Sequence, residues 1–159
     1  CRILDMCCGT LSNGLAIAKE KSKCKVYGID RSGEMLREAK RKIKKSGLNN
    51  IKVKTADATA SGLREKCFDY IVIGLVLHEC SPELRNGILN EAYRLLKDDG
   101  KLIVLEWEKE NNTYDIKKTG KAVIHRDNTQ NTIVLITCKK NTKDKQVVYV
   151  AYLNNKSNY

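Results

Sequence analysis

The sequence predicts a single α/β domain built on a doubly wound, mainly parallel sheet. Strand-like and helix-like segments alternate from the first residue to Trp107, and three of the strand-like segments end in an acid. The length of 159 residues allows one domain with a sizeable core but not two ordinary ones. We expect that domain to span residues 1–159, with a motif-bearing core at 1–107, a β-rich part at 108–153 and a tail at 154–159.

The first part of the chain alternates strands with helices. Short apolar runs that close on an acid predict strands at 1–6, 25–30 and 51–57. Apolar residues at helical spacing predict helices at 13–21 and 32–45. The apolar residues of the second helix share one face, so its many basic residues are expected on the outer face.

The middle of the chain contains its longest apolar run. That run, 68–77, predicts a strand buried on both faces, and a short helix is expected before it at 60–66. Residues 82–96 carry one apolar stripe and follow a candidate N-cap, Ser81. Because Gly100 follows the stripe, we expect a helix that ends before this glycine.

The last part of the chain is rich in β-forming residues. An apolar segment at 101–107 predicts a fifth strand of the parallel sheet. Three further β-rich runs follow at 121–126, 132–140 and 146–153, with no helical pattern between them. Strands without crossover helices pair antiparallel, so we expect these runs to form antiparallel strands at one edge of the sheet.

The net charge of +11 is compatible with nucleic-acid binding. Its densest part is the segment 37–45, where six of nine residues are basic. These residues belong to the predicted outer face of an amphipathic helix, and a solvated face is the simpler interpretation. Nucleic acid therefore stays a possible partner that the sequence does not favour.

Composition predicts a cytoplasmic protein. No apolar run approaches the roughly 20 residues that cross a bilayer, so we expect no membrane span. The seven cysteines are scattered without a CxxC pair or zinc-ligand spacing, which predicts neither a disulfide framework nor a metal site and fits a reducing compartment. No signal peptide precedes the first strand, and because the chain starts with Cys1 rather than Met we expect an N-terminal segment to be missing.

Three predicted strands end in an acid: Asp5, Asp30 and Asp57. Ligands of open α/β sheets bind beyond the carboxyl ends of the strands, so the three acids are candidates for one site. The segment "LDMCCGTLSNG" at 4–14 does not fit the G-x-G-x-x-G pattern, and Asp5 would repel a dinucleotide pyrophosphate.

S-adenosylmethionine fits these acids better, because it carries an ammonium and a sulfonium and no phosphate. Asp30 lies 21 residues after Gly9 and suits a ribose diol, whose two hydroxyls a carboxylate can accept. Asp57 is placed to accept a hydrogen bond from the adenine amino group.

The motifs that carry these acids resemble those of the class I S-adenosylmethionine-dependent methyltransferases. "ILDMCCGT" is similar to the first motif and "VYGIDRSGEML" to the second, while "KTADAT", "FDYIVIGLVLHE" and "AYRLLKDDGKLIVLEW" follow in the family's order. The resemblance covers residues 2–107, and within the family the motifs are most similar to those of the ubiquinone/menaquinone-biosynthesis C-methyltransferases. It implies a Rossmann-like fold, S-adenosylmethionine as cofactor and methyl transfer as the reaction.

The resemblance also implies positions for the cofactor. Asp5, Cys7 and Gly9 would surround its methionine part, and Gly74 would lie under the transferable methyl group.

The nucleoside would lie at the second and third acids. Asp30 would hold the ribose, with Arg31 and Met35 beside the adenine. Asp57 and the backbone N–H of Ala58 would bind the edge of the adenine ring.

Two departures from the family pattern bear on function. Leu11 stands where a third small residue is usual, and its side chain either turns into the core or obstructs the methionine part of the site. His78 and Glu79 stand where the quinone methyltransferases have an arginine–asparagine pair. His78 is either a general base or a loop histidine that shapes the pocket.

We therefore expect an enzyme that transfers a methyl group to a small-molecule acceptor. A catalytically silent module of the same fold and an RNA methyltransferase are the alternatives that the sequence leaves open.

Overall fold

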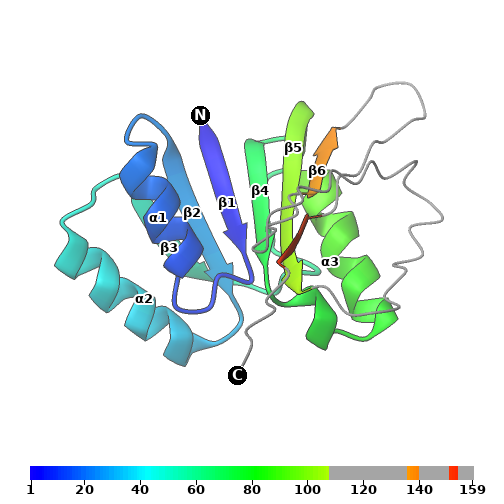
Figure 1. Ribbon diagram of the computed structural model, residues 1–159, viewed down its shortest axis with the longest axis horizontal. Helices are drawn as coiled ribbons and strands as arrows, with labels where there is room; N and C mark the ends of the chain where they lie inside the picture. Colours follow the sequence, from blue (N-terminus) through cyan, green and yellow to red (C-terminus); the bar gives the residue numbers. More distant parts are fainter. Residues whose placement is uncertain (108–135, 140–150, 154–159) are drawn as a thin grey trace.

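The computed structural model describes residues 1–107, 136–139 and 151–153, and the side chains through residue 105 (Figure 1). Its centre is a parallel sheet in the order β3-β2-β1-β4-β5, flanked by helices. The strands are β1 Arg2–Met6, β2 Lys25–Asp30, β3 Ile51–Thr55, β4 Phe68–Gly74 and β5 Leu96–Trp107. The helices are α1 Ser12–Glu20, α2 Gly33–Ser46 and α3 Pro82–Leu95, with a short 3-10 helix, η1 Leu77–Glu79. The predicted Rossmann-like α/β fold is confirmed.

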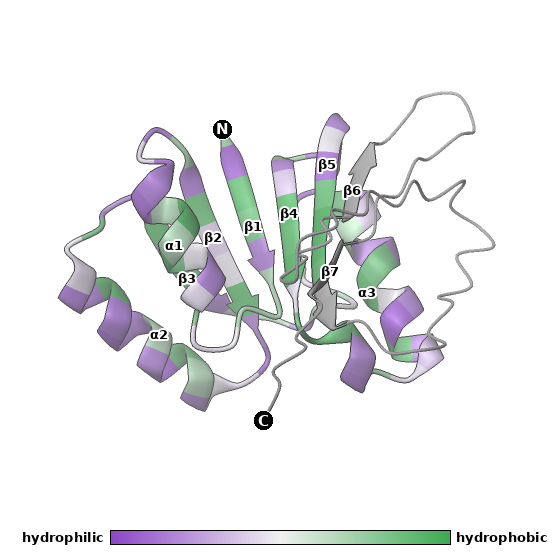
Figure 2. Cartoon of the chain, viewed as in Figure 1, coloured by the Kyte–Doolittle hydropathy of each residue, from purple (hydrophilic) through white to green (hydrophobic). Residues whose placement is uncertain are grey.

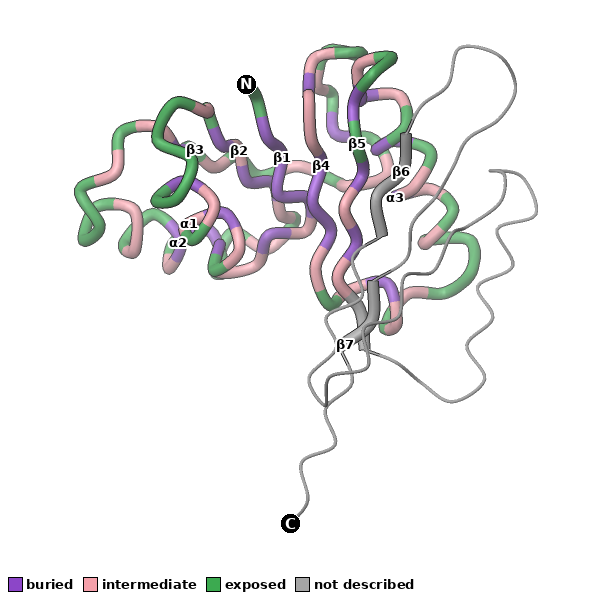
Figure 3. Tube along the Cα trace, turned by 45° about the horizontal axis from the view of Figure 1, so that its top comes forward, coloured by how far each residue is buried: buried purple, intermediate pink, exposed green. Residues whose placement is uncertain are grey.

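Buried apolar residues form a core on each face of the sheet, and the strands and helices that carry them are coloured by hydropathy in Figure 2 and by burial in Figure 3. On one face α1 and α2 bury Ala18, Leu36 and Ala39 against β2 and β3. On the other face α3 buries Ile88 and Leu95. The amphipathic pattern of the helices and the apolar strands between them account for this layering.

The segment between β3 and β4 forms no helix, so the helix predicted at 60–66 is wrong. The backbone N–H of Ser61 donates to Glu91 Oε1 at 2.9 Å, and its hydroxyl donates to the same atom. Gly62 has a φ of +64°, which a right-handed helix does not allow. A contact with α3, 30 residues away along the chain, thus sets the conformation of this segment.

Two element ends also differ from the prediction. β4 stops at Gly74 because Leu75 has a φ of +54°, so the predicted strand at 68–77 is too long. α3 ends at Leu95, and Leu96 already pairs with Phe68 as the first residue of β5. Gly100 is not the residue that ends the helix; it lies in β5, where a Cβ would stand 3.0 Å from a backbone oxygen of β4.

The far edge of the sheet is only partly antiparallel. β6, Ile136–Lys139, pairs antiparallel with β5, as predicted. β7, Ala151–Leu153, pairs parallel with β5, so the antiparallel prediction is wrong for this strand. β7 runs opposite to β6, and because β6 is antiparallel to β5, β7 is parallel to β5. The strand predicted at 121–126 lies outside the described residues.

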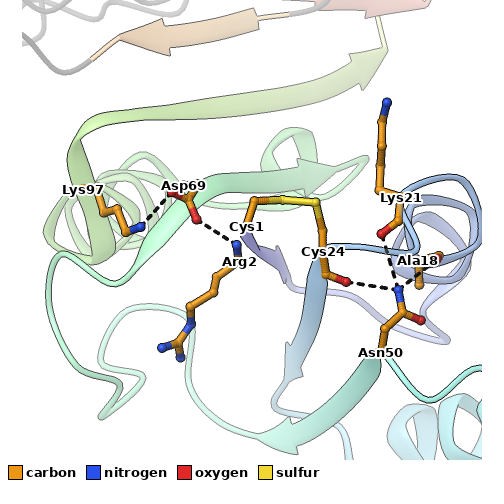
Figure 4. Close-up of a disulfide and its surroundings, with 8 residues drawn as sticks. All are labelled: Cys1, Arg2, Ala18, Lys21, Cys24, Asn50, Asp69 and Lys97. Carbon is orange, nitrogen blue, oxygen red and sulfur yellow. Dashed lines mark hydrogen bonds and ion pairs between the residues drawn. A yellow bond between two sulfur atoms is a disulfide. The ribbon is translucent and has the colours of Figure 1, made fainter.

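A disulfide joins Cys1 to Cys24, although the cysteine spacing predicted none (Figure 4). The pairing of β1 with β2 brings their amino ends together, with a Cα–Cα distance of 4.6 Å between the two cysteines. The two cysteines are 23 residues apart in the sequence, and that spacing alone does not show that the folded sheet brings them together. Within the described part of the chain, Cys7, Cys8 and Cys67 are free thiols.

Polar contacts join the remaining strands at the same end of the sheet (Figure 4). Asp69 of β4 accepts hydrogen bonds from the backbone N–H of Arg2 and from Lys97 Nζ, both at 2.7 Å. Asn50 donates to the carbonyl oxygens of Ala18 and Cys24 at 2.9 and 3.0 Å. The amino ends of all five parallel strands are thereby cross-linked.

Among the described residues, no helix has the length and apolar character that a membrane crossing requires. The same residues contain no group of three or more His, Cys, Asp or Glu side chains that could hold a metal ion.

Candidate cofactor-binding site

The loop after β1 is tightly wound at the carboxyl edge of the sheet. Cys7, Gly9 and Leu11 have φ values of +57°, +51° and +67°, so three of its five residues are left-handed. The backbone N–H of Cys8 donates to the Ile29 carbonyl of β2 at 2.9 Å. The loop therefore bends over the ends of β1 and β2 before α1 begins.

Asp30 at the end of β2 holds this loop in place. Its Oδ2 accepts from the backbone N–H of Gly9 at 2.8 Å, and its Oδ1 accepts from the backbone N–H of Ser32 at 2.8 Å. Each carboxylate oxygen has a second lone pair, so both can still accept hydroxyl groups. Among the described residues, nothing beyond its chain neighbours lies within 4 Å of where a Cβ on Gly9 would stand, which leaves room for a ligand on this side of the loop. These features fit a ribose at Asp30 and a cofactor over Gly9.

Asp5 lies beneath the loop instead of on its surface. Its side chain is 1% exposed, and Oδ2 accepts from the backbone N–H of Gly14 in α1 at 2.8 Å. Burial, opposed by this hydrogen bond and reinforced by the charge of Asp30, raises the pKa of Asp5 from 3.8 to about 7. The acid thus supports the first turn of α1, and its action on the cofactor stays a prediction.

We expect Asp5→Asn to be more stable than the unmodified chain at pH 8. The unfolded chain ionises Asp5 above pH 3.8, whereas the folded chain retains the proton to about pH 7, so this group costs the fold stability as pH rises between these values. The amide removes that cost while still accepting from Gly14. The free energy of unfolding without cofactor should rise by roughly 1–3 kcal/mol at pH 8.

The gain should vanish near pH 4, where Asp5 is protonated in the folded chain. Asp99→Asn, which changes an exposed acid, is the matched control and should change little at either pH. A variant at Asp5 that is less stable at pH 8 than the unmodified chain would contradict the account.

The third acid lies exposed at the end of β3. Asp57 Oδ1 accepts from both the backbone N–H and the hydroxyl of Thr59 at 2.7 Å, and these bonds lower the pKa of Asp57. The charge of Arg31 lowers the pKa of Asp57 further. Ala58 is half-buried, and Met35 in the first turn of α2 is 46% exposed. The backbone N–H of Ala56 donates to the Asp30 carbonyl at 3.0 Å, so the ends of β2 and β3 lie side by side.

Gly74 closes β4 beside the end of β1. A Cβ at this position would overlap Nδ2 of Asn13, a residue that the sequence analysis did not single out. The sequence could have indicated Asn13 by its position two residues after Leu11, in the first turn of α1. Asn13 is thus added to the residues of the site.

His78 lies in η1, after the end of β4. Its side chain is 16% exposed, and Nε2 stands 3.6 Å from Glu79 Oε1. The role of His78 as a general base stays a prediction.

Leu11 turns into the core. It is fully buried, packed under α1 and α2. A Cβ on Gly14 or Gly28 would stand 2.6 or 2.5 Å from its Cδ1, so these two glycines leave the room that the leucine fills. Of the two positions considered from the sequence, the one in which Leu11 turns into the core is observed.

A protein-family model described as a methyltransferase domain matches residues 3–100. The chain belongs to the class I S-adenosylmethionine-dependent methyltransferases. It is 34% identical over 106 residues to the demethylmenaquinone methyltransferase of Geobacillus sp. (strain WCH70), a match that covers 66% of this chain and 44% of that protein. The chain thus spans less than half the length of this relative.

Solved methyltransferase structures share the fold. A SAM-dependent methyltransferase from Aquifex aeolicus is 29% identical with a TM-score of 0.62, over 70% of this chain and 59% of that chain. PKMT2 from Rickettsia typhi, solved in complex with AdoHcy, is 29% identical with a TM-score of 0.58, over 65% of this chain and 20% of that chain.

Proposed function

We propose that this chain binds S-adenosylmethionine at the carboxyl edge of its sheet and transfers the methyl group to a small-molecule acceptor. The observation that carries the proposal is Asp30, whose carboxylate is fixed by two backbone N–H groups while retaining lone pairs for a ribose. The open space above Gly9 gives the cofactor access to the backbone of the loop. Family membership and the AdoHcy bound to the Rickettsia relative support the choice of ligand.

The contribution of the protein to such a reaction is positioning. The sulfonium supplies an activated methyl group when the cofactor is bound, so an in-line displacement needs orientation and exclusion of water more than acid–base chemistry. Asp30 would fix the ribose, the loop 7–11 would hold the methionine part, and Gly74 would leave room for the acceptor to approach. The acid–base role of His78 is a secondary part of the proposal.

The acceptor is proposed only by class. The curated relatives are named for demethylmenaquinone, which favours a small molecule. His78 and Glu79 replace the arginine–asparagine pair of the quinone methyltransferases, so the acceptor is expected to differ from a quinone. The alternative of an RNA acceptor rests on the net charge alone. The proposal also includes a cytoplasmic location.

The test is the affinity of Asp30→Ala for S-adenosylmethionine, measured by calorimetry. The substitution removes hydrogen bonds to a carboxylate, each worth about 1.5–3 kcal/mol, from the ribose and also releases Gly9. We expect binding to weaken by about a hundredfold or more. Glu34→Ala, which removes an exposed acid from the first turn of α2, is the matched control and should bind normally. Affinity within about threefold of normal in Asp30→Ala would refute the site.

A further inference from the structure

The disulfide between Cys1 and Cys24 lies at the amino ends of β1 and β2, at the edge of the sheet opposite the cofactor site (Figure 4). Cys1 is exposed and Cys24 is half-buried, so the bond is not enclosed by the core. A pocket of about 180 Å³, lined by Cys1, Asp69, Tyr70 and Asp99, lies beside it. A small thiol or disulfide therefore has space to approach Cys1.

Positive charges flank the other cysteine of the pair. Lys23 and Lys25 are the direct neighbours of Cys24, and both are exposed. Cations beside a thiol favour its thiolate, which is the attacking and the leaving form in thiol–disulfide exchange. The acids of the pocket adjoin Cys1, and one of them, Asp69, is paired with Lys97 Nζ at 2.7 Å. Cys24 therefore has the surroundings of a reactive thiolate.

Backbone contacts hold the two cysteines together independently of the disulfide. The backbone N–H of Lys25 donates to the Cys1 carbonyl at 2.8 Å, and five residue pairs join β1 to β2. Asn50 Nδ2 donates to the Cys24 carbonyl at 3.0 Å. When the disulfide opens, these contacts keep the two thiols adjacent, so the bond can close again.

We propose that Cys1 and Cys24 form a reversible redox modification site that exchanges with low-molecular-weight thiols and disulfides. In the oxidising direction, the Cys1 thiolate attacks one sulfur of glutathione disulfide, forms a mixed disulfide and releases one glutathione thiolate. The Cys24 thiolate then attacks Cys1 Sγ, closes the protein disulfide and releases the second glutathione thiolate. Two electrons pass from the two cysteines to glutathione disulfide, and the two protons of the cysteine thiols end on the two glutathiones. Two molecules of reduced glutathione reverse these steps.

The modification changes the stability of the fold. A closed disulfide restricts the unfolded chain between two cysteines that are 23 residues apart, so the oxidised form is the more stable one. This inference does not rest on the proposed function, because the pair lies at the amino ends of the strands and the cofactor site at their carboxyl ends.

The test incubates the folded chain with excess glutathione disulfide or excess reduced glutathione, followed by alkylation and peptide mapping. We expect the Cys1–Cys24 link in the first condition, two alkylated cysteines in the second, and full conversion between them in both directions. The oxidised form should melt about 10 °C higher than the reduced form.

Two variants test the order of the steps. Cys24→Ser lacks the thiolate that releases glutathione, so in excess glutathione disulfide it should accumulate one glutathione on Cys1. Cys67→Ser changes a half-buried free thiol and is the matched control, which should open and close the pair as the unmodified chain does.

The proposal is overturned if excess reduced glutathione leaves the link intact in the folded chain, because the disulfide is then purely structural. It is also overturned if the pair stays reduced in excess glutathione disulfide, or if the two forms of the unmodified chain melt at the same temperature. A Cys24→Ser chain without glutathione on Cys1 would refute Cys1 as the first cysteine to react.

Discussion

Glu91→Ala is expected to lower the free energy of unfolding by about 1–3 kcal/mol, the scale of leaving buried hydrogen-bond donors without an acceptor. Glu91 is 6% exposed, and its Oε1 and Oε2 accept from Arg94 Nη2 and Nε at 2.7 and 2.8 Å. Oε1 also accepts from the backbone N–H and the hydroxyl of Ser61. Removing the carboxylate leaves these donors without their acceptor and releases the segment between β3 and β4. Denaturant titration of the variant measures the loss.

The same site predicts a dependence on pH. Hydrogen bonds from Arg94, and then from Ser61, lower the pKa of Glu91 from 4.5 to about 2 despite its burial. The stabilisation is therefore complete above pH 4.5 and is lost as pH falls toward 2, because the unfolded chain takes up the proton first. Glu91→Gln should flatten this part of the stability profile, whereas Glu20→Gln on the exposed face of α1 should not. An unaltered profile in Glu91→Gln would contradict the assignment.

Leu11→Ala is expected to destabilise the fold by about 2–5 kcal/mol, since it removes a fully buried side chain and leaves a cavity beside Gly14 and Gly28. Leu11→Gly loses the same side chain but relieves the left-handed backbone, where φ is +67°. The glycine variant should therefore be the more stable of the two by about 1 kcal/mol, the reverse of the usual order in helices.

Chemical unfolding of both variants measures this order. Leu84→Ala, at a leucine that is 38% exposed, is the control and should cost much less. If Leu11→Ala proves more stable than Leu11→Gly, the backbone at this position is not strained in solution.

The strands and the two longest helices could be predicted because each is an apolar pattern of local origin. β2 has the predicted bounds, and α2 lies within one residue of them. The errors occur where distant residues decide the conformation. Ser61 bonds to Glu91, and Leu96 leaves its helix to pair with Phe68. Neither partner can be identified from the local sequence.

For the candidate site, too, the sequence predicted what depends on local pattern and not what depends on packing. Strand ends fixed the positions of Asp5, Asp30 and Asp57, because parallel strands share one carboxyl edge. Sequence position could not show that Asp5 is buried under α1, that Leu11 fills the space left by two glycines, or that Asn13 reaches Gly74. Those facts depend on how α1 packs on the sheet.

β3 is an edge strand of the sheet, and this position affects whether two copies of the chain can pair through their strands. A border strand exposes backbone donors and acceptors that can pair with a strand of another molecule. In β3 the solvent-exposed residues include Lys52 and Lys54, two positive charges on alternate residues of one strand. A second copy that paired with β3 in register would bring like charges together, which is unfavourable. We therefore expect these two lysines to oppose the pairing of β3 with a strand of a second copy.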